Sequence, residues 1–206
     1  MALLIRPRPP APSDGAAPGA RLRDAVVRVG GKGRPVRTLD CVSLAVEPAR
    51  FTAVFGPAGS GKSTLLRCLA GDEGLSSGHA SIGDVDLAGL RARPLRRLCG
   101  ARVARLSGAL TSEAEWFAAI LATPARPDEG GRWAAAVRDL ACSPKLILAD
   151  DVTGDSELPA FLRRMVDAFG QTVVMATRDA AAAARADHSV RLEAGRVVRR
   201  TDGLAA

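Results

Sequence analysis

The most informative motif of this chain is GPAGSGKST, which runs from Gly56 to Thr64. It fits the pattern G-x-x-x-x-G-K-[ST], a glycine-rich loop that ends in a lysine and a hydroxyl residue. The apolar run RFTAVFG predicts a strand over 50–56 that leads into the loop, and apolar residues at i, i+3 and i+4 predict a helix over 62–70 that follows it. A loop of this kind between a strand and a helix indicates a phosphate-binding site.

The residue types of the loop suit a nucleotide triphosphate with Mg²⁺. Gly56, Gly59 and Gly61 allow the backbone to curl so that its N–H groups point at phosphate oxygens, and the start of the helix adds a positive dipole end. Lys62 is expected to reach the β- and γ-phosphates, and the hydroxyl of Ser63 to bind Mg²⁺. The predicted nucleotide-binding residues of the loop are Gly56, Pro57, Ala58, Gly59, Ser60, Gly61, Lys62, Ser63 and Thr64.

A second motif supplies a carboxylate for the metal. Four apolar residues, LILA, predict a buried strand over 145–150 that ends in Asp150. A buried carboxylate is costly unless it lies at the end of the strand and contacts a cation, so we predict that Asp150 is the second metal ligand beside Ser63. The less favoured interpretation is a surface acid in a loop.

The rest of the chain predicts one α/β domain. Its 206 residues suffice for a single full-sized domain over 21–206, preceded by a disordered tail over 1–20 that is rich in Pro, Ala and Gly. Apolar strands alternate with amphipathic helices, which is typical of layered α/β folds. The further strands are expected over 42–47, 172–177 and 189–193, and the further helices over about 132–141 and over 158–169.

Composition argues against several classes of function. The net charge is +7, but the arginines are interspersed with apolar residues and the chain has no Tyr, so we expect no nucleic-acid partner. The four cysteines have no metal-binding spacing, which disfavours a zinc site. No run approaches the roughly 18 apolar residues of a membrane span, so membrane association is expected through a partner.

With both motifs in place, the chain resembles the ATP-binding subunit of ABC transporters, of the type that serves lipoprotein-releasing and macrolide-export systems. The resemblance is colinear from about residue 21 to residue 199, and its segments are 38–71, 76–90, 143–155 and 172–198. It implies a P-loop NTPase of the ABC-ATPase type, with a mixed β-sheet, flanking helices and an antiparallel β-layer. The helical subdomain of the family would be shortened here to about 106–131.

The resemblance also implies ligands and partners. The cofactors would be ATP and Mg²⁺, and the partners a membrane permease, a second ATP-binding subunit, or both, in a homodimer or a heterodimer. In the family two such subunits enclose two ATP molecules, each between one subunit's phosphate loop and the other's L-S-G-G-Q signature. The expected location is cytoplasmic, peripheral to the inner face of the cell membrane.

Five positions depart from the family pattern. Val29 falls near the position of the aromatic residue that stacks on adenine in the family. Arg105 falls near the position of the family's glutamine that contacts Mg²⁺. The sequence ARPDEGGRWAAAV, at 125–137, has no L-S-G-G-Q signature. At the catalytic positions, Asp151 replaces the general-base glutamate with a carboxylate one methylene shorter, and Arg178 replaces a histidine that contacts the γ-phosphate.

Because the phosphate- and metal-binding residues are retained while the catalytic ones are altered, we expect MgATP binding with weak or absent hydrolysis. A working transport ATPase with tolerated substitutions remains a second hypothesis. A soluble, repurposed nucleotide-dependent regulator is a third, favoured by the shortened helical subdomain, and a P-loop kinase is a weaker fourth.

Overall fold

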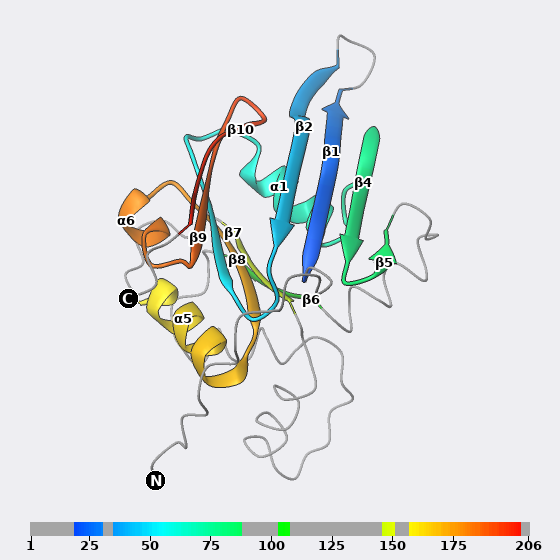
Figure 1. Cartoon of the computed structure of the whole chain (residues 1–206). Helices are drawn as coiled ribbons and strands as arrows, with labels where there is room; N and C mark the ends of the chain where they lie inside the picture. Colours follow the sequence, from blue (N-terminus) through cyan, green and yellow to red (C-terminus); the bar gives the residue numbers. More distant parts are fainter. Residues whose placement is uncertain (1–18, 31–34, 88–102, 108–145, 151–156, 203–206) are drawn as a thin grey trace, which may run out of the picture.

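The computed structural model describes residues 19–30, 35–87, 103–107, 146–150 and 157–202. These residues form two β-sheets and three helices, with α1 between the sheets (Figure 1). The elements are β1 (Ala20–Val29), β2 (Val36–Val46), β3 (Phe51–Phe55), α1 (Lys62–Leu69), β4 (Ser77–Ile82), β5 (Val85–Asp86), β6 (Val103–Ser107), β7 (Leu146–Asp150), α5 (Leu158–Phe169), β8 (Thr172–Thr177), α6 (Ala180–Ala183), β9 (His188–Glu193) and β10 (Arg196–Asp202).

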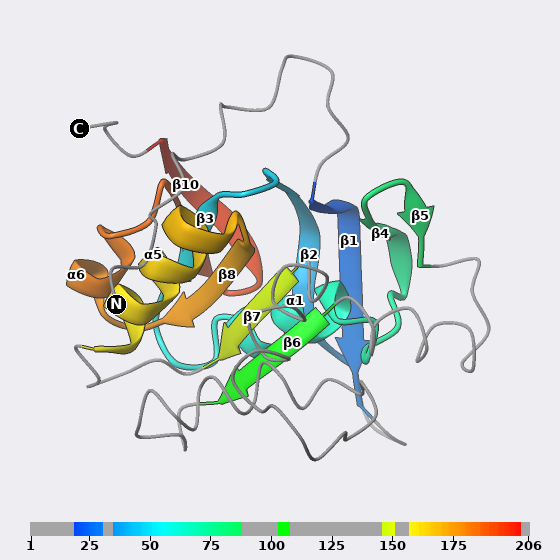
Figure 2. The same ribbon diagram turned by 90° about the horizontal axis from the view of Figure 1, so that it is seen from below.

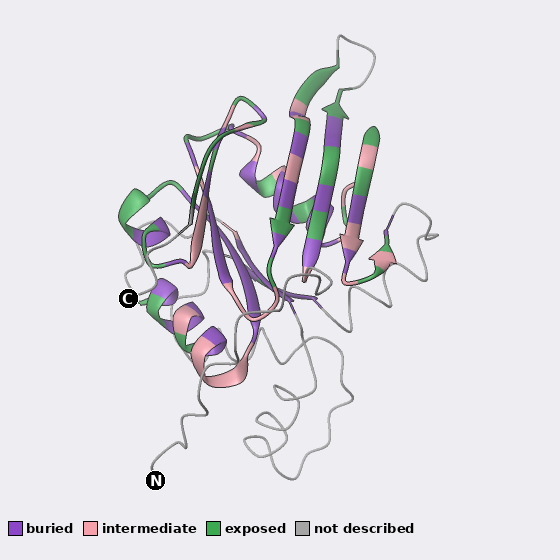
Figure 3. Ribbon diagram, in the orientation of Figure 1, coloured by how far each residue is buried: buried purple, intermediate pink, exposed green. Residues whose placement is uncertain are grey.

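The larger sheet is mixed and carries the phosphate loop. Its strand order is β10-β9-β3-β8-β7-β6; β6, β7, β8, β3 and β9 run parallel, and β10 is antiparallel to β9. All six residues of β8 and the first four of β3 and β7 are buried, which agrees with their apolar sequences (Figure 3). Since the parallel strands end at one edge, the carboxyl ends of β3, β7 and β8 lie along that edge.

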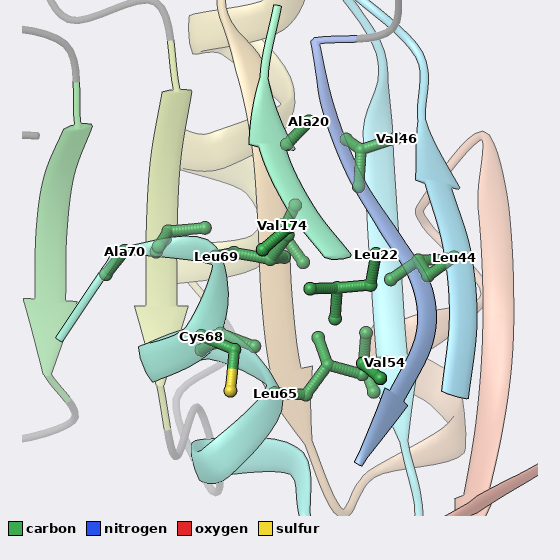
Figure 4. Close-up of a cluster of buried hydrophobic side chains, with 14 of the residues drawn as sticks. Ala20, Leu22, Leu44, Val46, Val54, Leu65, Cys68, Leu69, Ala70 and Val174 are labelled. Atoms are coloured by element: carbon green, nitrogen blue, oxygen red, sulfur yellow. The ribbon is translucent and has the colours of Figure 1, made fainter. Parts of the chain in front are cut away.

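The smaller sheet is antiparallel, with the order β2-β1-β4-β5, and it packs on the other side of α1. Helix α1 therefore buries side chains toward both sheets. Leu65 and Leu69 lie against Leu22 of β1 and against Val54 and Val174 of the larger sheet (Figure 4). This shared core holds the helix that begins at the phosphate loop in a fixed place between the two layers.

Helices α5 and α6 cover the opposite face of the larger sheet (Figure 2). Helix α5 has a proline in its first turn and ends before Gly170, whose φ of 65° is the left-handed conformation that terminates helices. Phe161 and Met165 of α5 pack with Phe51 of β3 in a second buried cluster. Strand β3 is thus packed on both faces, which fixes the starting point of the phosphate loop.

The predicted elements within the described residues are confirmed, with different ends. The strand expected over 42–47 is longer and begins at Val36, and β1 begins at Ala20, one residue before the expected start of the domain. Periodicity did not predict β6, a short strand at the end of the sheet order, and β6 includes the first two residues of the expected helical subdomain. The other residues of that subdomain, the helix expected over 132–141 and residues 1–18 lie outside the described residues.

Candidate phosphate- and metal-binding site

The phosphate loop occupies the turn between β3 and α1, as the motif predicted. Its shape requires glycine where it touches neighbouring backbone. A Cβ on Gly56 would lie 2.1 Å from the carbonyl oxygen of Leu192, and a Cβ on Gly61 would lie 2.4 Å from that of Thr38. Gly61 also has a φ of 103°, which L side chains rarely adopt. Two of the motif's glycines therefore serve close packing of the loop against β2 and β9.

Lys62 points into the loop. Its Nζ donates hydrogen bonds to the carbonyl oxygens of Gly56 at 2.9 Å and Pro57 at 2.7 Å, and to Oγ of Ser60 at 3.3 Å. The side chain is buried, with 9% of its surface exposed, and these acceptors offset the cost of burying the ammonium group. The ammonium group of Lys62, which the sequence analysis expects to reach the phosphates, thus lies inside the curve of the loop.

Ser63 and Asp150 come together at the mouth of the site. Ser63 Oγ donates a 3.0 Å hydrogen bond to Oδ1 of Asp150, which is the last residue of β7. Both atoms are hard oxygens of the kind that Mg²⁺ prefers. Within the described ranges there is no group of three or more His, Cys, Asp and Glu side chains that could hold a metal by themselves. A pair of oxygens beside a phosphate loop fits an ion that completes its shell with phosphate and water.

The start of α1 is suited to an anion. The first turn of a helix has N–H groups that no carbonyl of the same helix can reach. The N-cap, Gly61, contributes no side-chain hydrogen bond, and the first turn of α1 contains no acidic residue. The positive end of the helix dipole therefore meets no carboxylate from α1 itself.

Arg178 follows β8 at the same edge of the sheet. The last residue of β8, Thr177, is the register partner of Phe55, and its carbonyl accepts a 3.3 Å hydrogen bond from the N–H of Gly56. Arg178 is exposed, and Asp179 caps the short helix α6 by accepting from the N–H of Ala181 at 2.8 Å. Arg178 thus directly follows Thr177, the residue whose carbonyl contacts Gly56 at the start of the phosphate loop.

Val29 is the last residue of β1, and it is 45% exposed. Its register partner on β2 is Val36, which is 65% exposed. These are two of the three large hydrophobic residues that are exposed among the described residues, the third being Val198 of β10. Sequence reasoning singled out Val29 and missed Val36, because the pairing depends on the register of the hairpin.

Arg105 lies in the middle of β6, two residues before the position opposite Asp150. Arg105 pairs with Leu148, whereas Ser107 is the residue of β6 opposite Asp150. The guanidinium of Arg105 forms an ion pair with Asp72, just beyond α1. A small cavity of about 50 Å³ lies there, lined by Leu66, Arg67, Arg105, Leu106, Leu148 and Asp150. The position on β6 level with the candidate metal ligand is therefore Ser107, which is not a glutamine either.

Asp151, the predicted general-base position, and residues 125–137, where the signature would fall, lie outside the described residues. Of the predicted site residues, the loop 56–64, Asp150, Arg178 and Val29 lie among the described residues, and hydrogen bonds join Lys62 to the loop and Ser63 to Asp150.

Known proteins are similar to this chain in sequence. Residues 39–110 match the model of the ABC transporter family. The chain is 32% identical over 172 residues to the aliphatic sulfonates import ATP-binding protein SsuB of Delftia acidovorans, covering 69% of this chain and 68% of that protein. It is 29% identical to the lipoprotein-releasing system ATP-binding protein LolD of Anaeromyxobacter dehalogenans, covering 76% and 83%.

A longer relative and a solved structure extend the comparison. The macrolide export ATP-binding/permease protein MacB of Rhodospirillum rubrum is 32% identical over 80% of this chain, but the chain spans only 31% of its length. The chain likewise spans 22% of the molybdenum import protein ModC 2 and 60% of the Fe(3+) ions import protein FbpC. The fold matches the dimeric ABC transporter cassette MJ0796 with a TM-score of 0.73 at 21% identity, over 89% of this chain and 98% of that one. The sequence similarity, together with a phosphate loop in the expected fold, shows that this chain belongs to the ATP-binding proteins of ABC transporters.

Proposed function

We propose that the chain binds MgATP as the ATP-binding subunit of an ABC transporter and hydrolyses it slowly or not at all. The observation that carries this proposal is the contact between Ser63 and Asp150 beside a loop that already encloses the ammonium group of Lys62. A cation, a hydroxyl and a carboxylate at one sheet edge are the groups that a magnesium triphosphate requires.

In the proposed complex, Lys62 would exchange the carbonyl oxygens of Gly56 and Pro57 for the β- and γ-phosphate oxygens. The N-terminal N–H groups of α1 would hold the β-phosphate, and Ser63 and Asp150 would hold Mg²⁺ directly or through its water. Bound Mg²⁺ would neutralise part of the phosphate charge. Val29 would contact the base as an apolar surface without the face of an aromatic ring, so base selectivity should be weak.

The impaired hydrolysis is proposed from two residues. The carboxylate of Asp151 is one methylene shorter than a glutamate, so it would hold an attacking water away from its best position. Arg178 is a permanent cation and has no acceptor, so it would bind the γ-phosphate but could not relay a hydrogen bond. Ground-state binding of ATP is thereby favoured over its cleavage.

The proposed partners are a membrane permease subunit, a second ATP-binding subunit, or both, and no nucleic acid. MacB and LolD are named for export and release systems, which supports a transport role. No helix among the described residues is both long enough and apolar enough to cross a bilayer. We therefore propose that the chain reaches the inner face of the cell membrane through its partner.

The test is titration calorimetry of the purified chain with MgATP, with phosphate release followed on the same samples and Lys62→Ala as the comparison. The proposal expects saturable binding that is lost in Lys62→Ala, with phosphate release no higher than in that variant. Absence of binding in the unmodified chain would reject it.

A second candidate function is a working transport ATPase. It is favoured by the fact that Asp151, directly after Asp150, is still a carboxylate. Phosphate release that depends on Lys62 would support this candidate. A soluble regulator is the third candidate, and failure to recover any membrane subunit with the chain from its native membrane extract would favour it.

A further inference from the structure

The turn between β9 and β10 touches both the phosphate loop and β2. The N–H of Gly195 donates a 2.9 Å hydrogen bond to the carbonyl oxygen of Ser60, and the carbonyl oxygen of Gly195 accepts a 2.9 Å hydrogen bond from the N–H of Asp40. One glycine of a distant hairpin therefore connects the phosphate loop to β2 through its own peptide groups. Figure 1 shows the tip of this hairpin at the same end of the molecule as the connection from β3 to α1.

Ser60 contacts both Gly195 and Lys62 and so links the turn to the lysine of the phosphate loop. It is 2% exposed, its carbonyl is held by Gly195, and its hydroxyl accepts from Nζ of Lys62 at 3.3 Å. A shift of the turn would therefore move the residue on which the ammonium group rests.

The turn has little freedom to move. Ala194 and Gly195 have φ values of 46° and 77°, which is the pair of positive angles that a two-residue hairpin turn of type I′ requires. A Cβ on Gly195 would lie 2.8 Å from the carbonyl oxygen of Thr38. The same carbonyl oxygen lies 2.4 Å from the Cβ position of Gly61. The carbonyl oxygen of Thr38 thus lies between the turn and the phosphate loop, and the residue that faces it on each side, Gly195 or Gly61, is a glycine.

Side chains support the same connection. Arg196 donates from Nε at 2.9 Å and from Nη2 at 2.6 Å to Oδ2 of Asp40, and Arg37 donates to Oδ1 at 3.0 Å. The hydrogen bond from Arg196 lowers the pKa of Asp40 below its ordinary value of 3.8, so this carboxylate is charged at neutral pH. A charge-assisted pair with two donors has a defined geometry, which keeps the hairpin against β2.

We propose that Gly195, supported by the Asp40–Arg196 pair, is a positioning residue for the phosphate loop, acting through Ser60 on Lys62. The binding geometry of the loop is then set from the C-terminal hairpin and not by the loop alone. The consequence for nucleotide affinity rests on the proposed function, while the effect on the loop itself does not.

The experiment compares two hairpin glycines in the full chain. Gly195→Ala adds a Cβ against Thr38. Gly83→Ala places the same group in the β4–β5 turn, where φ is 57° and no atom of the described residues, apart from the chain neighbours, lies within 4 Å of the added Cβ. Both substitutions strain a left-handed residue, but only the first disturbs the phosphate loop. Amide hydrogen exchange over 56–64 is measured without nucleotide, and affinities for MgATP and for magnesium tripolyphosphate are measured by calorimetry.

We expect Gly195→Ala to speed exchange in the loop and to weaken both ligands alike, by about tenfold or more. Gly83→Ala should change neither. Equal exchange and equal affinity in the two variants would overturn the proposal. If the unmodified chain binds neither ligand, the proposed function fails, and the exchange comparison still decides the role of Gly195.

A second pair of variants covers the case in which Gly195→Ala does not fold. Arg196→Gln removes the contact with Asp40, whereas Arg191→Gln removes an ion pair with Glu193 that stays within β9. We expect faster loop exchange and only about a two- to fivefold loss of affinity in Arg196→Gln, and neither change in Arg191→Gln, because an exposed ion pair contributes little. Arg196→Lys, which keeps the charge, should recover part of the loss. A loss shared by Arg191→Gln would contradict the proposal.

Discussion

The hydroxyl of Ser63 donates a 3.0 Å hydrogen bond to Asp150, and this bond joins the first turn of α1 to the end of β7. It brings together the two residues that the sequence nominated as metal ligands from separate motifs. Helix α1 is held between the two sheets by its buried leucines, so the position of Ser63 is defined by the core.

Asp150→Asn should weaken MgATP binding while leaving metal-free ATP binding nearly unchanged. The amide keeps the shape of the side chain and its acceptor for Ser63, but it loses the charge that favours Mg²⁺. We expect the ratio of affinities with Mg²⁺ and with EDTA to fall on the order of tenfold. Calorimetry under both conditions measures it, with the exposed Asp84→Asn as the matched control. A ratio unchanged from that control would remove Asp150 from the metal site.

Lys62→Ala should lower the stability of the nucleotide-free chain as well as abolish binding. The carbonyl oxygens of Gly56 and Pro57 lose a charged donor, which costs about 1–2 kcal/mol. Thermal melting without nucleotide should show the decrease. A melting temperature equal to that of the unmodified chain would mean that the contacts of Lys62 with Gly56 and Pro57 contribute nothing to folding.

Asp151→Glu should raise phosphate release if the shorter carboxylate limits hydrolysis. The longer side chain would restore the reach of the general base, and the increase should be about tenfold or more. Phosphate release is measured beside the double variant Asp151→Glu/Lys62→Ala, which should stay at background. No increase in either the single variant or its combination with Arg178→His would place the limitation elsewhere in the chain.

Val29→Tyr should raise the affinity for ATP but not for tripolyphosphate. A ring at this position offers adenine a stacking face, which is worth about 0.5–1.5 kcal/mol. The exposed Val198→Tyr is the matched control, because Val198 is 52% exposed on β10. Equal gains for both ligands, or an equal gain in the control, would argue against a base site at Val29.

Because the thiol of Cys68 is buried, we expect the folded chain to lose stability at alkaline pH. Burial raises the pKa of this thiol from 9.0 to about 12, because the thiolate would lose its hydration in the core around α1. The folded state therefore holds the proton more tightly than the unfolded state, and this contribution is complete below pH 9.0 and is lost as the pH rises toward about 12. Denaturant unfolding of Cys68→Ala and of the unmodified chain should show a shallower alkaline decline in the variant. Parallel declines would contradict the assignment.

The central part of the site was predictable because it is local. A strand, a glycine-rich loop and a helix follow one another within a few residues, so the pattern alone places Lys62 and Ser63 at the loop. Asp150 was predictable for a related reason, since a carboxylate that ends an apolar strand must lie where charge is tolerated. The strands β7, β8 and β9 were predictable from their apolar runs, whereas β6, with Arg105 in its middle, was not.

Other features depend on which strands pair and in what register. No pattern in the sequence shows that Ser107 rather than Arg105 lies level with Asp150, or that Val36 lies beside Val29. These relationships follow from hydrogen-bonded ladders between segments far apart in the chain, and a shift of one residue would change every pair.

Residue types at fixed short spacings were enough to predict the family, the fold class and the candidate phosphate- and metal-binding residues. What surrounds the loop depends on long-range contacts: Gly195 donates to the carbonyl of Ser60, and the carbonyl of Thr38 lies close to both Gly61 and Gly195. Local spacing specifies which groups the loop contains, whereas packing against β2 and the β9–β10 hairpin specifies where those groups point.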